Sequence, residues 1–451
     1  MERTNVPTTS SSFNIHVQDD SLPSTKIQES RTRFKITALA TKFTQRLFRV
    51  LFVVHIILTS LLVIFLTVRG LLFFHRRHFH PKQWYPPMLA ATATSGVVAF
   101  VWQWFVPRYP ARAIKAAFWI SPLLTCAVGL LLVLIGSAAS LAIGSVAVVF
   151  SIILSLYACW VNPRFNYAIK ILSVSTAFPP GRINALVFMS ISISVVYSGF
   201  LVSGLGGATV TGTGLDILFK TVILISLIWS MQAMKNMLYV TVARIKYLHF
   251  SCGADMEMRV AIPDTIKHLM ESIFLGSILV PILTVIRGSA RAITLVAGDT
   301  DEFLFSCANC YSAIASTLVR FGNRWGFVQV GVYKKGFVQA SMDTWDMFTQ
   351  AGLETLINSD LTGSFCFLLG IAGGAICSLV GGTWTLVVHK SYAAEVTIYA
   401  FLVGYFMCRM AMAWPQACVS AYYLVYAENP QSLRFDPIIP VRLQELQRYG
   451  N

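Results

Sequence analysis

Long apolar stretches without charge constrain this chain more than any other feature. Residues 116–163 and 183–215 contain no charged side chain. A helix needs about 20 mostly apolar residues to cross a bilayer, and windows of that length recur along the sequence. Charged residues make up only 12% of the chain, against about 25% in a typical soluble protein. We therefore expect an all-α fold, a polytopic transmembrane helical bundle.

About ten windows are long enough to span a membrane. They lie at about 48–70, 87–107, 115–136, 139–161, 184–206, 216–241, 267–293, 303–322, 362–389 and 394–425. An even number of crossings places both termini on one side of the membrane.

The basic residues indicate which side that is. The formal net charge is +15, and most of the positive charge lies in short connections between the apolar windows. Lys and Arg are retained on the cytoplasmic side, so we expect the connections at 108–115, 164–182, 244–267 and 324–335 in the cytoplasm, with both termini. The uncharged 204–214 turn and the acidic 298–302 segment then lie outside. Residues 75–85 are basic as well, yet this topology also places them outside.

Three regions follow from these patterns. Residues 1–46 are polar and then basic, which predicts a disordered cytoplasmic tail that contacts anionic membrane lipids. Residues 47–426 form the transmembrane domain, and 427–451 form a cytoplasmic C-terminal tail. Within the domain, 164–178 and 337–358 mix apolar and polar positions in a way that is typical of amphipathic helices at a membrane surface. No basic patch is interleaved with aromatic residues outside the spans, so we expect no nucleic-acid partner.

Four motifs in the second half resemble the choline transporter-like family. They are Trp229-Ser-Met-Gln-Ala-Met-Lys-Asn236, Gly276-Ser-Ile-Leu279 with Arg287 downstream, Asn323-Arg-Trp-Gly-Phe-Val-Gln-Val-Gly-Val-Tyr333, and Ala427-Glu-Asn-Pro430. Their order is that of the family, and the resemblance covers about residues 160–445. One departure is that the family's Tyr-Gly-Lys reads Tyr333-Lys334-Lys335 here.

The resemblance implies a transporter of choline or a related organic cation in the plasma membrane. The sequence contains no G-x-x-x-x-G-K-[ST] loop for ATP, so we expect facilitated diffusion. We expect no enzymatic activity, because the acidic residues are scattered and no nucleophile–base arrangement is visible. No cofactor or metal is expected, and nothing in the sequence specifies an oligomeric state. The alternative function is a channel, scramblase or membrane scaffold that shares the fold without transporting choline.

A choline site inside a bilayer needs aromatic faces, because a quaternary ammonium group cannot donate a hydrogen bond. Each cation–π contact contributes about 0.5–2 kcal/mol, and polar groups within spans are often functional. The candidate substrate-binding residues are Trp229, Asn236, Glu271, Tyr405 and Trp414. Structural roles compete with this interpretation, because Trp and Tyr form interfacial belts and Glu271 could pair with Lys267 or His268.

Two further patterns leave alternatives open. Lys235 either faces the transport pathway or extends to the interface. The glycines of the ninth window, from Gly370 to Gly382, allow close helix packing or a flexible joint for alternating access. Of these two, packing is the interpretation that we favour.

Overall fold

The computed structural model describes residues 24–73, 80–177, 183–209, 214–297, 302–430 and 438–449. The chain divides into two units, Met1–Thr44 and Gln45–Asn451. The first unit is described only from Ser24, where a helix begins, so residues 24–44 of the expected disordered tail are helical. The paragraphs below concern the second unit.

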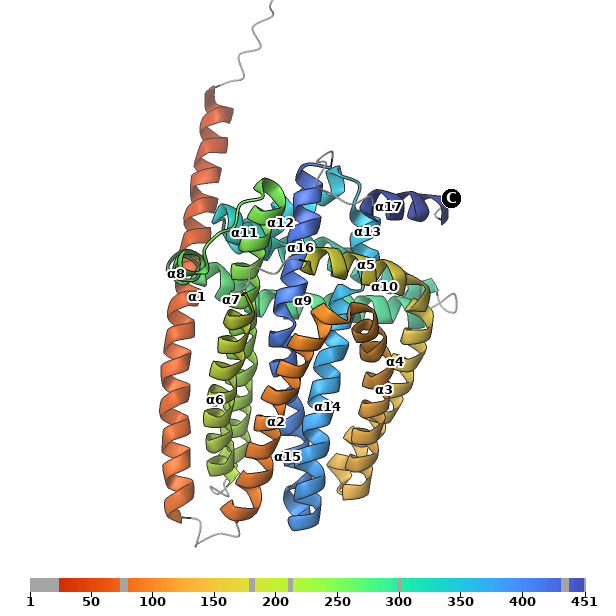
Figure 1. Cartoon of the computed structure of the whole chain (residues 1–451). Coiled ribbons are helices and arrows are strands. Elements are labelled where there is room, and N and C mark those ends of the chain that lie inside the picture. Colours follow the sequence, from red (N-terminus) through yellow and green to blue (C-terminus); the bar gives the residue numbers. More distant parts are fainter. Residues whose placement is uncertain are drawn as a thin grey trace, which may run out of the picture. The chain divides into compact units, whose positions relative to one another are not determined.

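The described residues form helices joined by short connections, without a strand (Figure 1), and α1 begins in the first unit. The helices are α1 (Ser24–Phe73), α2 (Pro81–Arg108), α3 (Pro110–Ile135), α4 (Ala138–Val161), the 3-10 turn η2 (Asn162–Arg164), α5 (Phe165–Thr176), α6 (Ile183–Thr209), α7 (Leu215–Cys252), α8 (Met258–His268), α9 (Met270–Ala297), α10 (Glu302–Phe321), α11 (Gly326–Tyr333), α12 (Phe337–Gln350), α13 (Glu354–Ser359), α14 (Thr362–Val388), α15 (Lys390–Ala411), α16 (Ala413–Glu428) and α17 (Ile438–Tyr449).

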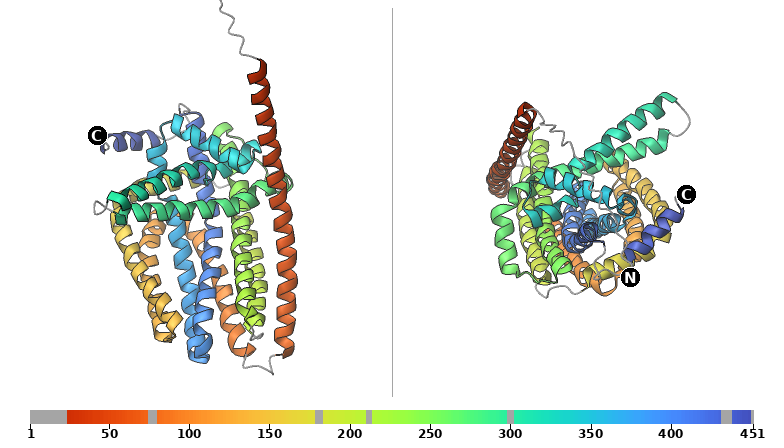
Figure 2. Two further views of the ribbon diagram at one scale, coloured as in Figure 1. Left: turned by 180° about the vertical axis from the view of Figure 1, so that it is seen from behind. Right: turned by 90° about the horizontal axis from the view of Figure 1, so that it is seen from above.

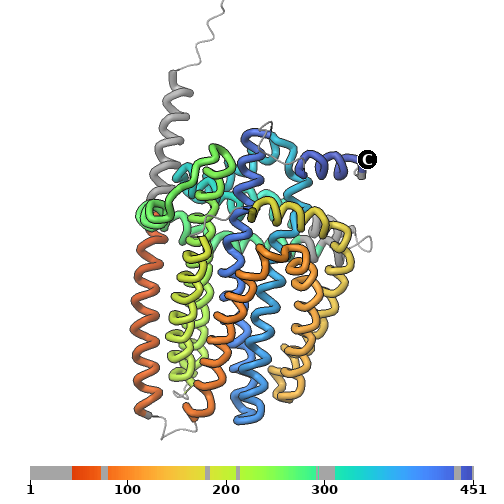
Figure 3. Tube along the Cα trace, in the orientation of Figure 1, coloured from red at the N-terminus to blue at the C-terminus, as the bar shows by residue number. Residues whose placement is uncertain are grey.

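The predicted fold class, an all-α polytopic bundle, is confirmed. Within the described ranges, nine helical segments are long and apolar enough to cross a membrane. The expected span at 303–322 corresponds to α10, which is not among them. The tube view shows α2, α3, α4, α6, α7 and α14 running side by side, with α15 continuing into α16 (Figure 3).

One pair of helices runs in a different direction. The stretch of α9 before residue 291 lies across the long helices and not along them, and the last turns of α10 lie beside it (Figures 1 and 2). The segment Met270–Ala290 has the length and composition of a span, so its apolar character alone does not set its direction. The acidic 298–302 turn expected outside the membrane falls almost wholly between the described segments.

Basic side chains gather at one end of the bundle. Helices α5, α8, α11, α12, α13 and α17 all lie there (Figure 1). The described basic residues of this end include Arg108, Arg112, Lys115, Arg164, Lys170, Arg244, Arg259, Lys267, Lys334 and Lys335. The opposite end carries the turn at Gly136, the start of α15 and the start of α2, where His80 and Lys82 belong to the basic 75–85 loop. Residues 74–79 of that loop lie outside the described residues.

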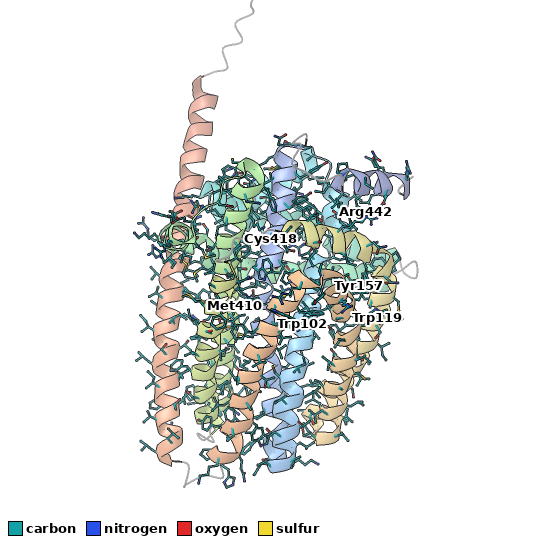
Figure 4. All side chains as sticks on the ribbon, viewed as in Figure 1. Trp102, Trp119, Tyr157, Met410, Cys418 and Arg442 are labelled. Atoms are coloured by element: carbon teal, nitrogen blue, oxygen red, sulfur yellow. The ribbon has the colours of Figure 1, made fainter. Side chains whose placement is uncertain are left out.

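The expected C-terminal tail begins inside a helix, because α16 continues to Glu428. Helix α17 then packs against α5 and α13. Figure 4 labels Arg442 on α17, whose guanidinium lies 5.4 Å from the centre of the Tyr167 ring on α5. The expected amphipathic helices at 164–178 and 337–358 correspond to α5, and to α12 and α13.

Helices α14 and α15 pack very closely because of their glycines. A Cβ atom at Gly374 would lie 2.8 Å from the carbonyl oxygen of Phe401, and one at Gly404 would lie 2.7 Å from the carbonyl oxygen of Gly373. Any side chain at these positions would force the two backbones apart. The packing role favoured for this glycine-rich segment therefore has direct support from the contacts.

Candidate substrate cavity

A cavity of about 710 Å³ lies among α4, α7, α9, α14 and α15, next to the connecting segments at the basic end. Its wall also includes residues of α10, α11, α13 and α16. Residues that are far apart in the sequence, from Tyr157 to Gln416, therefore meet around one space. Two kinds of side chain dominate the wall: aromatic rings and cations.

One aromatic part of the wall comes from α4, α14 and α15. Tyr157 and Trp160 stand one turn apart on α4, with ring centres 6.2 Å apart. Phe367 of α14 and Tyr405 of α15 meet edge to face, with ring centres 6.1 Å apart. The hydroxyl groups of Tyr157 and Ser364 are 2.8 Å apart, which joins α4 to α14. Figure 4 shows Tyr157 in the half of the bundle that carries α5. These rings offer faces to a cationic group.

The single carboxylate among the described lining residues is Asp360, and it is already paired. Its side chain is 1% exposed and accepts a hydrogen bond from the Arg324 guanidinium. It also accepts hydrogen bonds from the backbone N–H of Thr362, at 3.1 Å, and from the Thr362 hydroxyl, at 2.7 Å. A Cβ atom at Gly363 would collide with the Arg324 guanidinium. This ion pair is therefore built into the start of α14.

A second arginine, Arg409 of α15, lines the cavity without such a partner. Its Nε and one terminal nitrogen are buried and have no hydrogen-bond acceptor. Its aliphatic stem lies against Gly370 of α14. Lys235 of α7 lines the same cavity, within electrostatic range of both Arg409 and Arg324. The sequence left open whether Lys235 faces the pathway, and the structure places it at this cavity.

Amide side chains fix the neighbouring helices around the cavity. Asn236 of α7 donates a hydrogen bond of 2.9 Å to the hydroxyl of Ser277 on α9. Arg287, also on α9, donates one of 3.0 Å to the side-chain oxygen of Asn358. Asn323 donates to the backbone carbonyl of Ser341 at 2.9 Å and accepts from the N–H of Gly326 at the same distance. Asn323 therefore holds the start of α11 against α12.

The structure brings two of the five sequence-predicted site residues to the cavity, Asn236 and Tyr405. Trp229 lies instead against α1, with its ring centre 4.7 Å from His55 and 5.1 Å from Phe52. The carboxylate of Glu271 pairs with Arg49 of α1 at 3.5 Å, and not with Lys267 or His268.

The fifth candidate, Trp414, is fully buried at the start of α16 and is not one of the residues around the cavity. Its indole nitrogen has no hydrogen-bond partner. Its burial is typical of a core side chain.

Sequence reasoning missed Arg324, Asp360 and Arg409 as site residues. Arg409 had an available signal, because a charged residue inside an apolar span is itself an indication of function. No such signal marked Arg324 and Asp360, because they lie in segments that we expected at the membrane surface, where charged residues are ordinary. Their pairing depends on the tertiary fold, which brings the segment before α11 to the segment before α14.

Two of the motifs that are separate in the sequence meet at the basic end. The hydroxyl of Tyr333, at the end of α11, donates a 2.9 Å hydrogen bond to the carboxylate of Glu428 at the end of α16. Tyr247 of α7 donates to the same carboxylate. Glu428 thus joins three helices that surround the cavity, which gives the motif at residues 427–430 a structural role.

Comparison with known proteins identifies a family model described as plasma-membrane choline transporter, which matches residues 145–431, more than half of the chain. Protein pns1 of Aspergillus fumigatus is 22% identical over 219 residues, 45% of this chain and 41% of that protein. A CTL-like protein of Dictyostelium discoideum is 21% identical over 296 residues, 63% of this chain and 52% of that protein. The matches to these curated relatives thus span about half of their length or less.

Proposed function

Because the chain belongs to the choline transporter-like family, we propose that it carries choline or a related quaternary ammonium compound across a membrane by facilitated diffusion. The observation that supports this most strongly is the aromatic wall of the cavity. A trimethylammonium group binds through cation–π attraction and apolar contact, each ring contributing about 0.5–2 kcal/mol. Tyr405, Phe367 and Tyr157 supply such rings at the depth of the spans.

We assign the plasma membrane as the location and the basic end of the bundle as the cytoplasmic end. The excess of Arg and Lys at that end supports the orientation. The cavity lies toward the same end, while α14 and α15 pack backbone to backbone beyond it at Gly373 and Gly404. This arrangement suits an inward-facing state of a transporter.

The role of Tyr405 can be separated from general damage by two substitutions. Labelled choline uptake is measured in cells that lack their own choline uptake, at matched surface expression. Tyr405→Phe keeps the ring face and should retain uptake, whereas Tyr405→Ala should raise the KM about 2- to 30-fold, the loss of one ring contact. Trp119→Ala serves as the control, because Trp119 of α3 is exposed and does not line the cavity.

The absence of saturable uptake by the wild-type protein at confirmed surface expression would overturn the proposal. Equal choline uptake by Tyr405→Ala and Tyr405→Phe would be consistent with choline transport but would show that the Tyr405 ring does not contact the substrate. Trp229, Glu271 and Trp414 remain predicted substrate contacts only for a conformation in which they reach the pathway.

A further inference from the structure

The cavity wall carries more positive than negative side chains, whereas a ligand with only a positive charge would require the opposite. Its described wall carries Arg164, Lys235, Arg287, Arg324 and Arg409 against one carboxylate, Asp360. Arg324 neutralises Asp360, and the Arg164 guanidinium lies over the Trp160 ring, 4.8 Å from its centre. The positive charges of Lys235 and Arg409 face the cavity without a carboxylate of their own among the described lining residues.

Two such charges inside a bundle are costly. A buried charge without a counter-charge destabilises a protein by several kcal/mol, and ionisable groups at membrane depth generally pair with a partner or serve a substrate. Nε and one terminal nitrogen of Arg409 are buried without an acceptor, so nothing among the described residues compensates this guanidinium.

The position of Arg409 is sterically defined. A Cβ atom at Gly370 would lie 2.8 Å from Cγ of Arg409 and 3.0 Å from Cδ2 of Tyr405. The same glycine therefore makes room for a cation and for an aromatic ring. Tyr405 and Arg409 are four residues apart on α15, which places their Cβ atoms about 5–6 Å apart on one face of the helix.

An aromatic ring and a guanidinium at that spacing fit one ligand with two opposite charges. The quaternary ammonium would contact Tyr405, Phe367 and Tyr157, and an anionic group two carbons away would reach Arg409 and Lys235. A phosphate monoester carries about −1.5 to −2 charges at neutral pH, which matches two cations. A carboxylate carries only one charge, so a betaine would leave one of the two cations unmatched.

We propose that the preferred ligand of this cavity is a zwitterion of the choline phosphate class, with its quaternary ammonium on the aromatic wall and its phosphate on Arg409 and Lys235. This inference rests on the proposed function and refines its substrate class. The phosphate has two possible sources: a soluble phosphate monoester, whose charge matches both cations, or a lipid headgroup, whose phosphodiester carries one negative charge and matches only one of them. Trp160, Val285 and Phe367 line the cavity and are exposed apolar side chains, which suit the apolar part of either ligand.

The test is a binding measurement on the full chain in a maltoside detergent, which carries neither phosphate nor choline. Thermal unfolding and calorimetry are compared for choline, phosphocholine, glycerophosphocholine, glycine betaine and inorganic phosphate. Phosphocholine should bind at least about tenfold more tightly than choline, since a hydrogen bond to a charged group contributes about 1.5–3 kcal/mol. Arg409→Gln should remove that advantage of phosphocholine over choline.

Three controls keep the result interpretable. Lys170→Gln removes a cation of α5 that does not line the cavity and should change nothing. Arg409→Lys keeps the charge but not the planar guanidinium, so it should retain part of the advantage even if Arg409→Gln folds poorly. Lys235→Met should weaken phosphocholine more than glycerophosphocholine, because the monoester carries the second charge.

The sources are distinguished by repeating the measurement in vesicles. Displacement of phosphocholine by phosphatidylcholine, but not by phosphatidylglycerol, would assign the site to a lipid headgroup, and no displacement would assign it to a soluble ester. Choline or glycine betaine binding as tightly as phosphocholine would overturn the inference. If the protein takes up choline but binds phosphocholine no more tightly than choline, only the inference about the ligand class is contradicted. If it binds phosphocholine but does not take up choline, choline is not the transported substrate.

Discussion

Gly370 of α14 lies directly against the side chain of Arg409 on α15, so that a Cβ atom at residue 370 would be 2.8 Å from Cγ and 2.9 Å from Cδ. The glycine determines where the guanidinium can stand. Because Gly370 also faces Tyr405, one position without a side chain supports both halves of the proposed ligand site.

We expect Gly370→Ala to weaken phosphocholine binding about tenfold, because the added methyl group displaces Arg409 and weakens one hydrogen bond to a charged group. Overpacking should also destabilise the bundle by about 1–3 kcal/mol. Calorimetry and thermal unfolding measure the two effects. Gly199→Ala is the control, since a Cβ atom there meets nothing within 4 Å. Unchanged phosphocholine affinity in Gly370→Ala would contradict the assigned role of Arg409.

Breaking the Arg324–Asp360 pair should strongly destabilise the protein. Asp360 is 1% exposed in its side chain, and removing one partner of a buried ion pair costs about 3–5 kcal/mol. We expect Asp360→Asn to lower the free energy of unfolding by an amount in that range. The comparison is Asp346→Asn, because Asp346 pairs with Arg320 at 2.8 Å with both side chains more than 40% exposed. Asp346→Asn should lower the free energy of unfolding by less than about 1 kcal/mol. Equal losses of stability in the two variants would show that burial does not strengthen the Arg324–Asp360 pair.

Acid should weaken the contact between α8 and α11 through Asp264. Hydrogen bonding from Lys334, at 2.9 Å, and from Arg244 holds the pKa of Asp264 below its ordinary value of 3.8. Because folding lowers the pKa of Asp264, its ionised carboxylate stabilises the folded protein at pH values above 3.8. This stabilisation is lost as the pH falls through the lowered pKa of the folded state. The wild type should therefore lose more stability than Asp264→Asn between about pH 5 and pH 3. The difference should be about 0.2–1 kcal/mol, and Asp255→Asn, a change at an exposed carboxylate, should follow the wild type.

Lys334 occupies the position where the family's Tyr-Gly-Lys motif has its glycine. The residue has φ of 53°, the one positive value among the described non-glycine residues, and ends α11 in the left-handed conformation. Both Lys334→Gly and Lys334→Ala remove the contact with Asp264, but only glycine adopts this conformation without strain. We expect Lys334→Gly to be more stable than Lys334→Ala by about 1 kcal/mol, and therefore to unfold at a higher temperature. The reverse order would show that the left-handed end of α11 is not strained.

Trp229 provides a test of the sequence-based site. Trp229 is half-buried and contacts Phe52 and His55. We therefore expect Trp229→Ala to lower stability, by less than the about 3–5 kcal/mol that removal of a fully buried aromatic side chain costs. The KM for choline should stay within about twofold of wild type at matched surface expression. A large rise in KM without a loss of stability would support the role that the sequence suggested for Trp229.

The sequence predicted the class of fold because spanning helices follow from length and apolarity alone. It also predicted that the basic connections gather at one end of the bundle. It did not predict the direction of α9, because the 267–293 window is as apolar as a true span, and direction depends on the surface that the helix packs against. For the same reason the sequence suggested Asn236 and Tyr405, which reach the cavity, together with Trp229 and Glu271, which face α1.

The residues around the cavity come from the middle and the very end of the chain, and this order affects biosynthesis. Translation delivers α7 with Lys235 into the membrane before α14, α15 and α16 exist. Until the later helices emerge, Lys235 lacks the rings of Phe367 and Tyr405 beside it, and a long side chain can then reach the interface by extending along the helix. Glu428, which joins α7, α11 and α16, arrives later than the other helices that it connects. A nascent chain that stalls before α16 would display an unfinished, positively charged groove, a feature by which membrane quality control can recognise it.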